Sequence, residues 1–102
     1  MLIPLPDESV RAIDSGWRII VLRCSLNPND VAARSDVGKY LGSLIEVHAE
    51  LDVMNLVPER TRHAALVLQP IVEDNPRNVA LAEVLRKIVD AGQQATAGAL
   101  AN

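Results

Sequence analysis

Residues 37–54 read VGKYLGSLIEVHAELDVM, and the spacing of the apolar side chains in this stretch decides the fold class. Apolar residues recur there at alternating steps of three and four, namely at Val37, Tyr40, Leu44, Val47, Leu51 and Met54. This spacing is typical of the seam along which one helix packs lengthwise against another. Polar residues such as Lys39 and Glu46 fall between the seam positions. The stretch therefore predicts a long amphipathic helix with a solvated opposite face.

Prolines divide the rest of the chain into further helical segments. The apolar spacing predicts helices over residues 7–26, 35–56, 58 onward and 76–91. Pro70 is expected to kink or end the third helix, Asn75 to cap the fourth, and Gly92 to end it. No internal repeat is evident. We expect an all-α fold, a small bundle of about four helices with the long second helix at its centre.

The chain has 102 residues, a length that fits one domain with one core. We assign residues 1–92 to a single helical domain. Residues 93–102 are rich in Ala, Gly and Gln and have no periodic apolar face. This last segment is expected to be a flexible C-terminal tail.

The segment Ile19–Leu22 allows two interpretations. Its β-branched run suits a short buried strand. The spacing of three and four continues through it, however, and favours a helix. In a helix, Ile19, Leu22 and Leu26 lie opposite Trp17, so the helix is apolar nearly all round. A helix of this kind is either central in its bundle or shared with a second subunit.

Composition argues against nucleic acid as a partner. The net charge is −3, and aromatic residues make up 2% of the chain. DNA-binding domains usually carry a basic excess, and single-strand binders need several exposed rings, so both features argue against nucleic acid. Cys24 is the only cysteine, which excludes an intramolecular disulfide. We expect its thiol to be a small buried hydrophobe.

Few residues suggest a catalytic, metal-binding or anion-binding site. His48 and Asp52 have the i, i+4 spacing of a pair of metal ligands, but no second histidine follows at helical spacing. An anion could bind where His63 follows Arg60 and Arg62 near a helix start, although plain solvation is the favoured interpretation. No Gly-rich phosphate loop or nucleophile motif occurs. We therefore expect no catalytic residues, no metal, no cofactor and no enzymatic activity.

A helix-turn-helix is the main alternative. It would comprise a short helix at Val31–Ala33, a turn at Ser35–Asp36 and a recognition helix from Val37. Lys39 is the one cation that would face the groove of DNA. This alternative predicts a small DNA-binding regulator.

Residues 1–6 have no charged n-region, no long apolar h-region and no small-residue cleavage site. No apolar run in the sequence approaches the length of a membrane span. We therefore expect a cytoplasmic protein.

The surplus of apolar surface on the first two helices predicts a protein–protein interface. The expected function is that of a non-enzymatic helical module that forms a homodimer and contacts an unidentified protein partner. An adaptor, a sequestering regulator (an anti-activator) and an immunity-type inhibitor all fit this description. The expected interface residues are Trp17, Ile19, Leu22, Arg23, Leu26, Tyr40, Leu44, His48 and Leu51.

Overall fold

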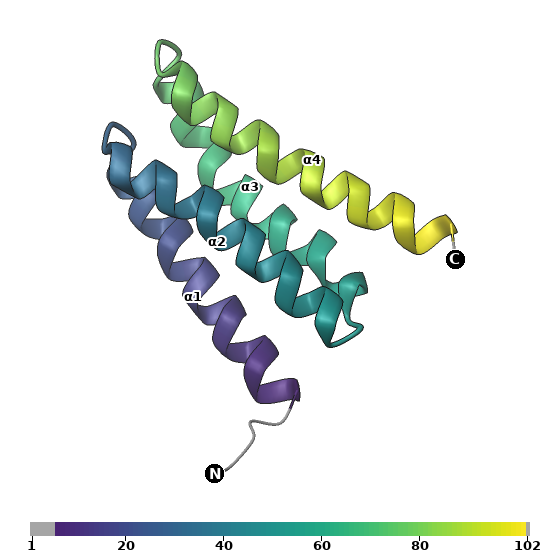
Figure 1. The fold of residues 1–102 in the computed structure, drawn as a ribbon. Coiled ribbons are helices and arrows are strands. Elements are labelled where there is room, and N and C mark those ends of the chain that lie inside the picture. Colours follow the sequence, from purple (N-terminus) through teal and green to yellow (C-terminus); the bar gives the residue numbers. More distant parts are fainter. Residues whose placement is uncertain (1–5, 102) are drawn as a thin grey trace.

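The structure is a computed structural model that describes the backbone of residues 6–101 and the side chains of residues 7–98. The helices of that range are α1 (Pro6–Leu26), α2 (Val31–Glu50), the short 3-10 helix η1 (Met54–Leu56), α3 (Val57–Asp74) and α4 (Val79–Ala101) (Figure 1). They confirm the expected all-α bundle, and residues 19–22 are helical. Residues 1–5, where the sequence lacks signal-peptide features, and Asn102 of the expected tail lie outside the described residues.

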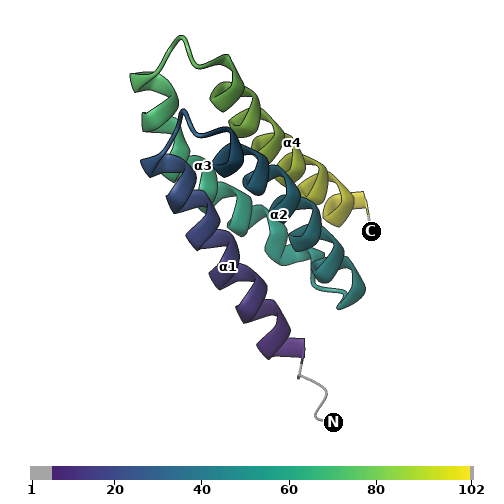
Figure 2. The ribbon, with the colours of Figure 1, turned by 60° about the vertical axis from the view of Figure 1, so that its left-hand side comes forward.

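The helices form two antiparallel hairpins, α1–α2 and α3–α4, which pack side by side (Figures 1 and 2). α1 packs against α2 and α3, whereas α4 packs against α3 and α2. Neighbouring helices of different hairpins, α1 with α3 and α2 with α4, run parallel (Figure 2). The molecule is flat, with extents of 45 × 36 × 17 Å. A long central second helix is not shown, because α2 has 20 residues, fewer than α1 with 21 and α4 with 23.

Within each hairpin, a glycine lets the two helices approach closely. A Cβ at Gly16 of α1 would overlap the Tyr40 hydroxyl of α2. Tyr40 in turn stacks on Trp17, with ring centroids 6.4 Å apart. In the second hairpin, a Cβ at Gly92 of α4 would overlap the Thr61 hydroxyl of α3. We call these two helix contacts the closed seams.

The core is aliphatic around one tryptophan. Its largest fully buried apolar side chains come from all four helices and are Trp17, Val21, Val37, Leu44, Val57, Leu68, Leu81 and Ile88. The buried stripe of α2 is Ala33, Val37, Leu41, Leu44 and His48. This stripe is rotated from the expected seam, because Tyr40 faces α1 within the hairpin and is only half-buried.

α2 ends at Glu50, before the residue 56 that the periodicity predicts. The reason is Asp52, whose φ of 57° lies in the left-handed region. The Val53 N–H donates to the His48 carbonyl at 2.9 Å, and the Asp52 N–H donates to the Ala49 carbonyl at 3.2 Å. These two bonds form a Schellman motif, in which glycine is the usual left-handed residue. Because this chain has an aspartate at that position, no glycine in the sequence indicates the end of α2.

The third and fourth helices also differ from their expected limits. α3 continues through Pro70 to Asp74. The carbonyl that Pro70 leaves without a donor belongs to exposed Leu66, so water can bond to it. α4 continues through Gly92 to Ala101, so residues 93–101 of the expected tail are helical, and Ala95 is buried. Gly92 does not adopt the positive φ of a helix cap. The assignment of residues 1–92 to one domain stays a prediction.

The turns that join the helices of each hairpin are equivalent, a repeat that the sequence analysis missed. They read NPND at residues 27–30 and NPRN at residues 75–78, and both are followed by Val-Ala. The Asn27 Nδ2 donates to the Arg23 carbonyl at 3.0 Å, and the Asn75 Nδ2 donates to the Ile71 carbonyl at 2.8 Å. The first asparagine of each turn therefore closes the preceding helix.

The fourth residue of each turn starts the next helix. The side-chain oxygens of Asp30 and Asn78 each accept a backbone N–H of the following helix at 2.9 Å. The residue that caps α4 is therefore Asn78, and the expected cap, Asn75, closes α3 instead. The Asn78 Nδ2 also donates to the Pro28 carbonyl at 2.9 Å and to Asn29 Oδ1 at 3.0 Å. The two turns are thus bonded to each other, and they hold the hairpins together at one end.

Candidate functional site

Three large apolar side chains project from α1 on the side opposite the core. Ile19, Leu22 and Leu26 are exposed by 66%, 53% and 71%. Trp17, on the opposite side of the same helix, is fully buried. Neither α3 nor α4 covers the three side chains, which we call the α1 outer face. Contiguous apolar surface of this kind is typical of interaction sites.

Two arginines flank the α1 outer face, and each is paired within the chain. Arg18 Nε lies 3.2 Å from Asp14 Oδ2 on the same helix. Arg23 Nη1 lies 2.9 Å from Asp36 Oδ2 of α2. Exposed pairs of this kind contribute little to stability. Their effect here is to neutralise the charge beside the apolar face.

The other expected interface residues lie elsewhere. Trp17, Leu44 and His48 are fully buried within one chain, so they offer a partner no surface. Tyr40 lies on α2 and Leu51 directly follows its last residue, and both are half-buried. Seam spacing identifies the residues that become buried, and in this chain the two hairpins bury most of them against each other. Of the expected interface residues, the structure brings those from 19 to 26 together on one surface.

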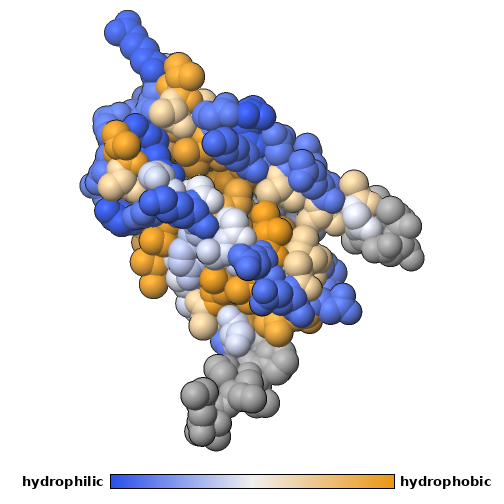
Figure 3. All heavy atoms as spheres, in the orientation of Figure 1, coloured by the Kyte–Doolittle hydropathy of each residue, from blue (hydrophilic) through white to orange (hydrophobic). Residues whose placement is uncertain are grey.

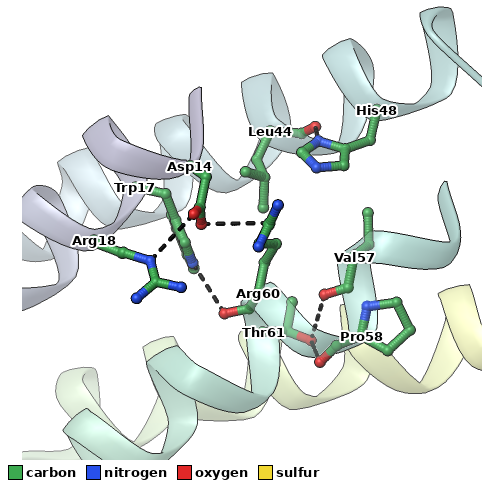
Figure 4. A network of polar contacts seen from close by, with 9 residues as sticks. All are labelled: Asp14, Trp17, Arg18, Leu44, His48, Val57, Pro58, Arg60 and Thr61. Atoms are coloured by element: carbon green, nitrogen blue, oxygen red, sulfur yellow. Dashed lines mark hydrogen bonds and ion pairs between the residues drawn. The ribbon is translucent and has the colours of Figure 1, made fainter. Parts of the chain in front are cut away.

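A network of polar contacts links α1 to α3 (Figure 4). Arg60 Nε lies 3.4 Å from Asp14 Oδ1, and these side chains are only 15% and 16% exposed. Trp17 Nε1 donates to the Arg60 carbonyl at 3.2 Å. The Asp14 carboxylate thus compensates for the burial of the guanidinium. Since Arg60 turns inward, it does not join the anion site considered beside His63.

His48 lies close to this network and points toward the Arg60 side chain (Figure 4). Its Nδ1 lies 2.7 Å from the Leu44 carbonyl. A carbonyl only accepts, so Nδ1 carries the hydrogen of this bond. The other ring nitrogen, Nε2, is buried without a hydrogen-bond partner. The imidazole is therefore a core side chain held by its own helix.

The geometry does not assemble the metal pair that the sequence suggested. α2 ends at Glu50, so the helical i, i+4 spacing from His48 does not reach Asp52. His48, Asp14 and Arg60 line none of four clefts that open on the surface of the described residues. Within residues 6–101, no three His, Cys, Asp or Glu side chains gather as a metal site would require.

The helix-turn-helix considered as an alternative between residues 30 and 45 is not formed. Ser35 and Asp36, its proposed turn, lie inside the continuous helix α2 (Val31–Glu50). The helix begins early because the Asp30 carboxylate accepts the N–H groups of Ala32 and Ala33. Asp36, the second residue of that proposed turn, pairs with Arg23 of α1.

Cys24 is buried in the core, as expected. Burial raises the pKa of its thiol above the ordinary value, against the opposing effect of the Arg34 charge. A thiol that stays protonated is a poor nucleophile, so Cys24 is a packing residue.

The sequence analysis also missed a groove between α2 and α4. One cleft of about 500 Å³ lies between α2 and α4 near the turns, and a second of about 430 Å³ lies between the C-terminal half of α4 and the chain from Ile45 of α2 to η1. We call this surface the α2–α4 groove. The available signal was the pair Gly38 and Gly42, four residues apart inside the best-specified helix of the chain.

None of the described helices has both the length and the apolar content needed to cross a membrane. Cytoplasmic localisation stays a prediction. Comparison with known proteins finds no matching family model, no matching curated protein and no matching solved structure.

Proposed function

We propose that this protein is a non-enzymatic helical module that acts through protein–protein contact and forms a homodimer through the α1 outer face. The observation that carries the proposal is the exposure of Ile19, Leu22 and Leu26 on one side of α1, by 53% or more each. Removing such side chains from water is the main driving force of association.

A second copy of the chain suits this face for two reasons. In a contact with two-fold symmetry, the same patch meets itself, and an apolar patch is complementary to itself. Like charges brought together across the axis would oppose the contact. Arg18 and Arg23 are already paired with Asp14 and Asp36, so this repulsion is reduced. An adaptor or a sequestering regulator would use such a dimer, whereas no observed feature favours the DNA-binding alternative.

The test is the molar mass of the wild type and of Leu22→Glu by light scattering over micromolar concentrations. We expect a wild-type dimer and a monomeric variant, because a buried unpaired carboxylate opposes association. Leu66→Glu is the matched control, since Leu66 lies on α3 and is exposed by 64%. This control should remain a dimer.

Far-UV circular dichroism should show the same helical content in all three proteins. A wild type that is monomeric at every concentration, or a Leu66→Glu variant that dissociates as Leu22→Glu does, would contradict the proposed dimer.

A further inference from the structure

The α2–α4 groove has an apolar floor between two parallel helices. Figure 3 shows orange and pale atoms gathered between the blue side chains of α2 and those of α4. The cleft near the turns is lined from both helices by Val37, Leu41, Val84 and Ile88. The second cleft adds the apolar Ile45, Met54, Ala91 and Ala95, together with the polar Asp52, Asn55 and Gln94. A groove with these linings can take apolar side chains along most of its length.

On the α2 side of this groove, two glycines leave the helix backbone without side-chain cover. A Cβ at Gly38 or Gly42 would meet nothing within 4 Å. Gly38 lines the groove, and Gly42 follows one helical turn later. Glycine inside a helix destabilises it relative to alanine. No contact within the described chain requires these two glycines, in contrast to Gly16 and Gly92. They leave the backbone of α2 open to close approach by another chain.

The charges beside the groove near the turns are mainly positive. Arg34, Lys39 and Lys87 line this cleft. Neither lysine forms an ion pair with a described residue. The one carboxylate of this cleft, Glu83, is bonded to Arg86. The end of the groove near the turns therefore attracts negative charge.

From the floor, the glycines and the charges, we propose that the α2–α4 groove binds an acidic amphipathic helix of another protein. The apolar stripe of that helix lies between α2 and α4, and its backbone passes over Gly38 and Gly42. Its carboxylates face Lys39 and Lys87. This is the helix-in-groove mode of recognition, in which apolar anchors give affinity and flanking charge gives orientation. It is independent of the α1 outer face, which lies on another helix.

The binding experiment uses two synthetic peptides of about 20 residues, the length of helix that spans about 30 Å. Both carry leucines at helical spacing on one face, and both carry a fluorescein label. One has glutamates on the flanks of this face and the other has lysines. Fluorescence anisotropy with the full chain should show that the acidic peptide binds about tenfold more tightly or better at low salt. Added salt should reduce this difference.

Three variants locate the site. Gly38→Gln should weaken binding of the acidic peptide about tenfold or more without lowering the thermal midpoint, because glutamine is the better helix former. Ala12→Gln, on exposed α1 surface, is the matched control and should bind as the wild type does. Lys39→Glu combined with Lys87→Glu should reverse the preference, so that the basic peptide binds more tightly.

The Leu22→Glu variant should bind the acidic peptide like the wild type, which separates this site from the proposed dimer contact. The proposal is overturned if neither peptide binds, if both bind equally, or if Gly38→Gln binds unchanged. It is also overturned if Gly38→Gln changes the molar mass in light scattering, because the groove then holds a second copy of this chain.

Discussion

The closed seams and the α2–α4 groove are both contacts between neighbouring helices, yet they use glycine in opposite ways. Gly16 and Gly92 lie where a neighbouring helix leaves no room for a Cβ. Gly38 and Gly42 lie where a Cβ would meet open space. The first pair allows helices to pack within one chain. The second pair weakens α2 without improving any contact in the described chain.

This difference shows which surfaces the fold itself needs. The closed seams hold each hairpin together, and the two bonded turns hold the hairpins at one end. The groove remains open because α2 and α4 pack less extensively against each other than the two helices within each hairpin do. A residue that destabilises its helix and improves no contact within the fold is the best candidate for a role in binding another molecule.

The largest effect is expected at a closed seam, from Gly92→Ala. The added Cβ would overlap the hydroxyl of Thr61, which is held by the Val57 and Pro58 carbonyls at 3.0 Å each. Overpacking of this kind lowers the free energy of unfolding by about 1–3 kcal/mol. Chemical denaturation followed by circular dichroism measures the change. A variant as stable as the wild type would show that the α3–α4 seam is not closed.

A smaller effect of opposite sign is expected at the groove, from the same substitution at Gly38 or Gly42. Alanine should raise the free energy of unfolding by about 0.5–1 kcal/mol at each position, because it is the better helix former and meets no neighbour. The same denaturation experiment provides the comparison with Gly92→Ala. If the Gly38→Ala and Gly42→Ala variants lose stability as Gly92→Ala does, the contrast between the closed seams and the α2–α4 groove is wrong.

The smallest effect concerns Cys24 in the core beside the α1–α2 seam. Burial raises the pKa of its thiol, so the folded chain holds this proton more tightly than the unfolded chain. Stability from this group is complete below the unfolded pKa of about 8.5 and is lost as the pH rises above it. Denaturation at pH 8 and pH 10 should therefore show a fall in stability that is smaller in Cys24→Ala. An equal fall in both proteins would exclude the thiol as its source.

The fold class could be predicted from the sequence because apolar spacing reports helices directly. The limits of α1 followed from this spacing almost to the residue. The end of α2 did not, because the apolar pattern continues past Asp52, and only its positive φ breaks the helix. The end of α4 was misplaced for the opposite reason. Gly92 resembles a helix stop in the sequence, but it is a packing residue.

The candidate surfaces were predicted in part. Ile19, Leu22 and Leu26 were identified from their position opposite Trp17, and the structure places them on the exposed surface of α1. His48 and Leu44 were assigned to an interface and lie in the core. The spacing of apolar residues along one helix shows that a face is buried. It does not show whether that face meets the same chain or another one.

The sequence by itself determined that the chain is helical, where α1 and α3 begin, and which sides of α1 are apolar. These properties depend on residues within a few positions of one another, through helical periodicity and capping. Only the tertiary structure decided that the hairpins pack with α1 parallel to α3 and α2 parallel to α4. It also decided that Arg60 reaches Asp14 and that the α2–α4 groove stays open. These features depend on contacts between residues far apart in the chain, and no local pattern encodes them.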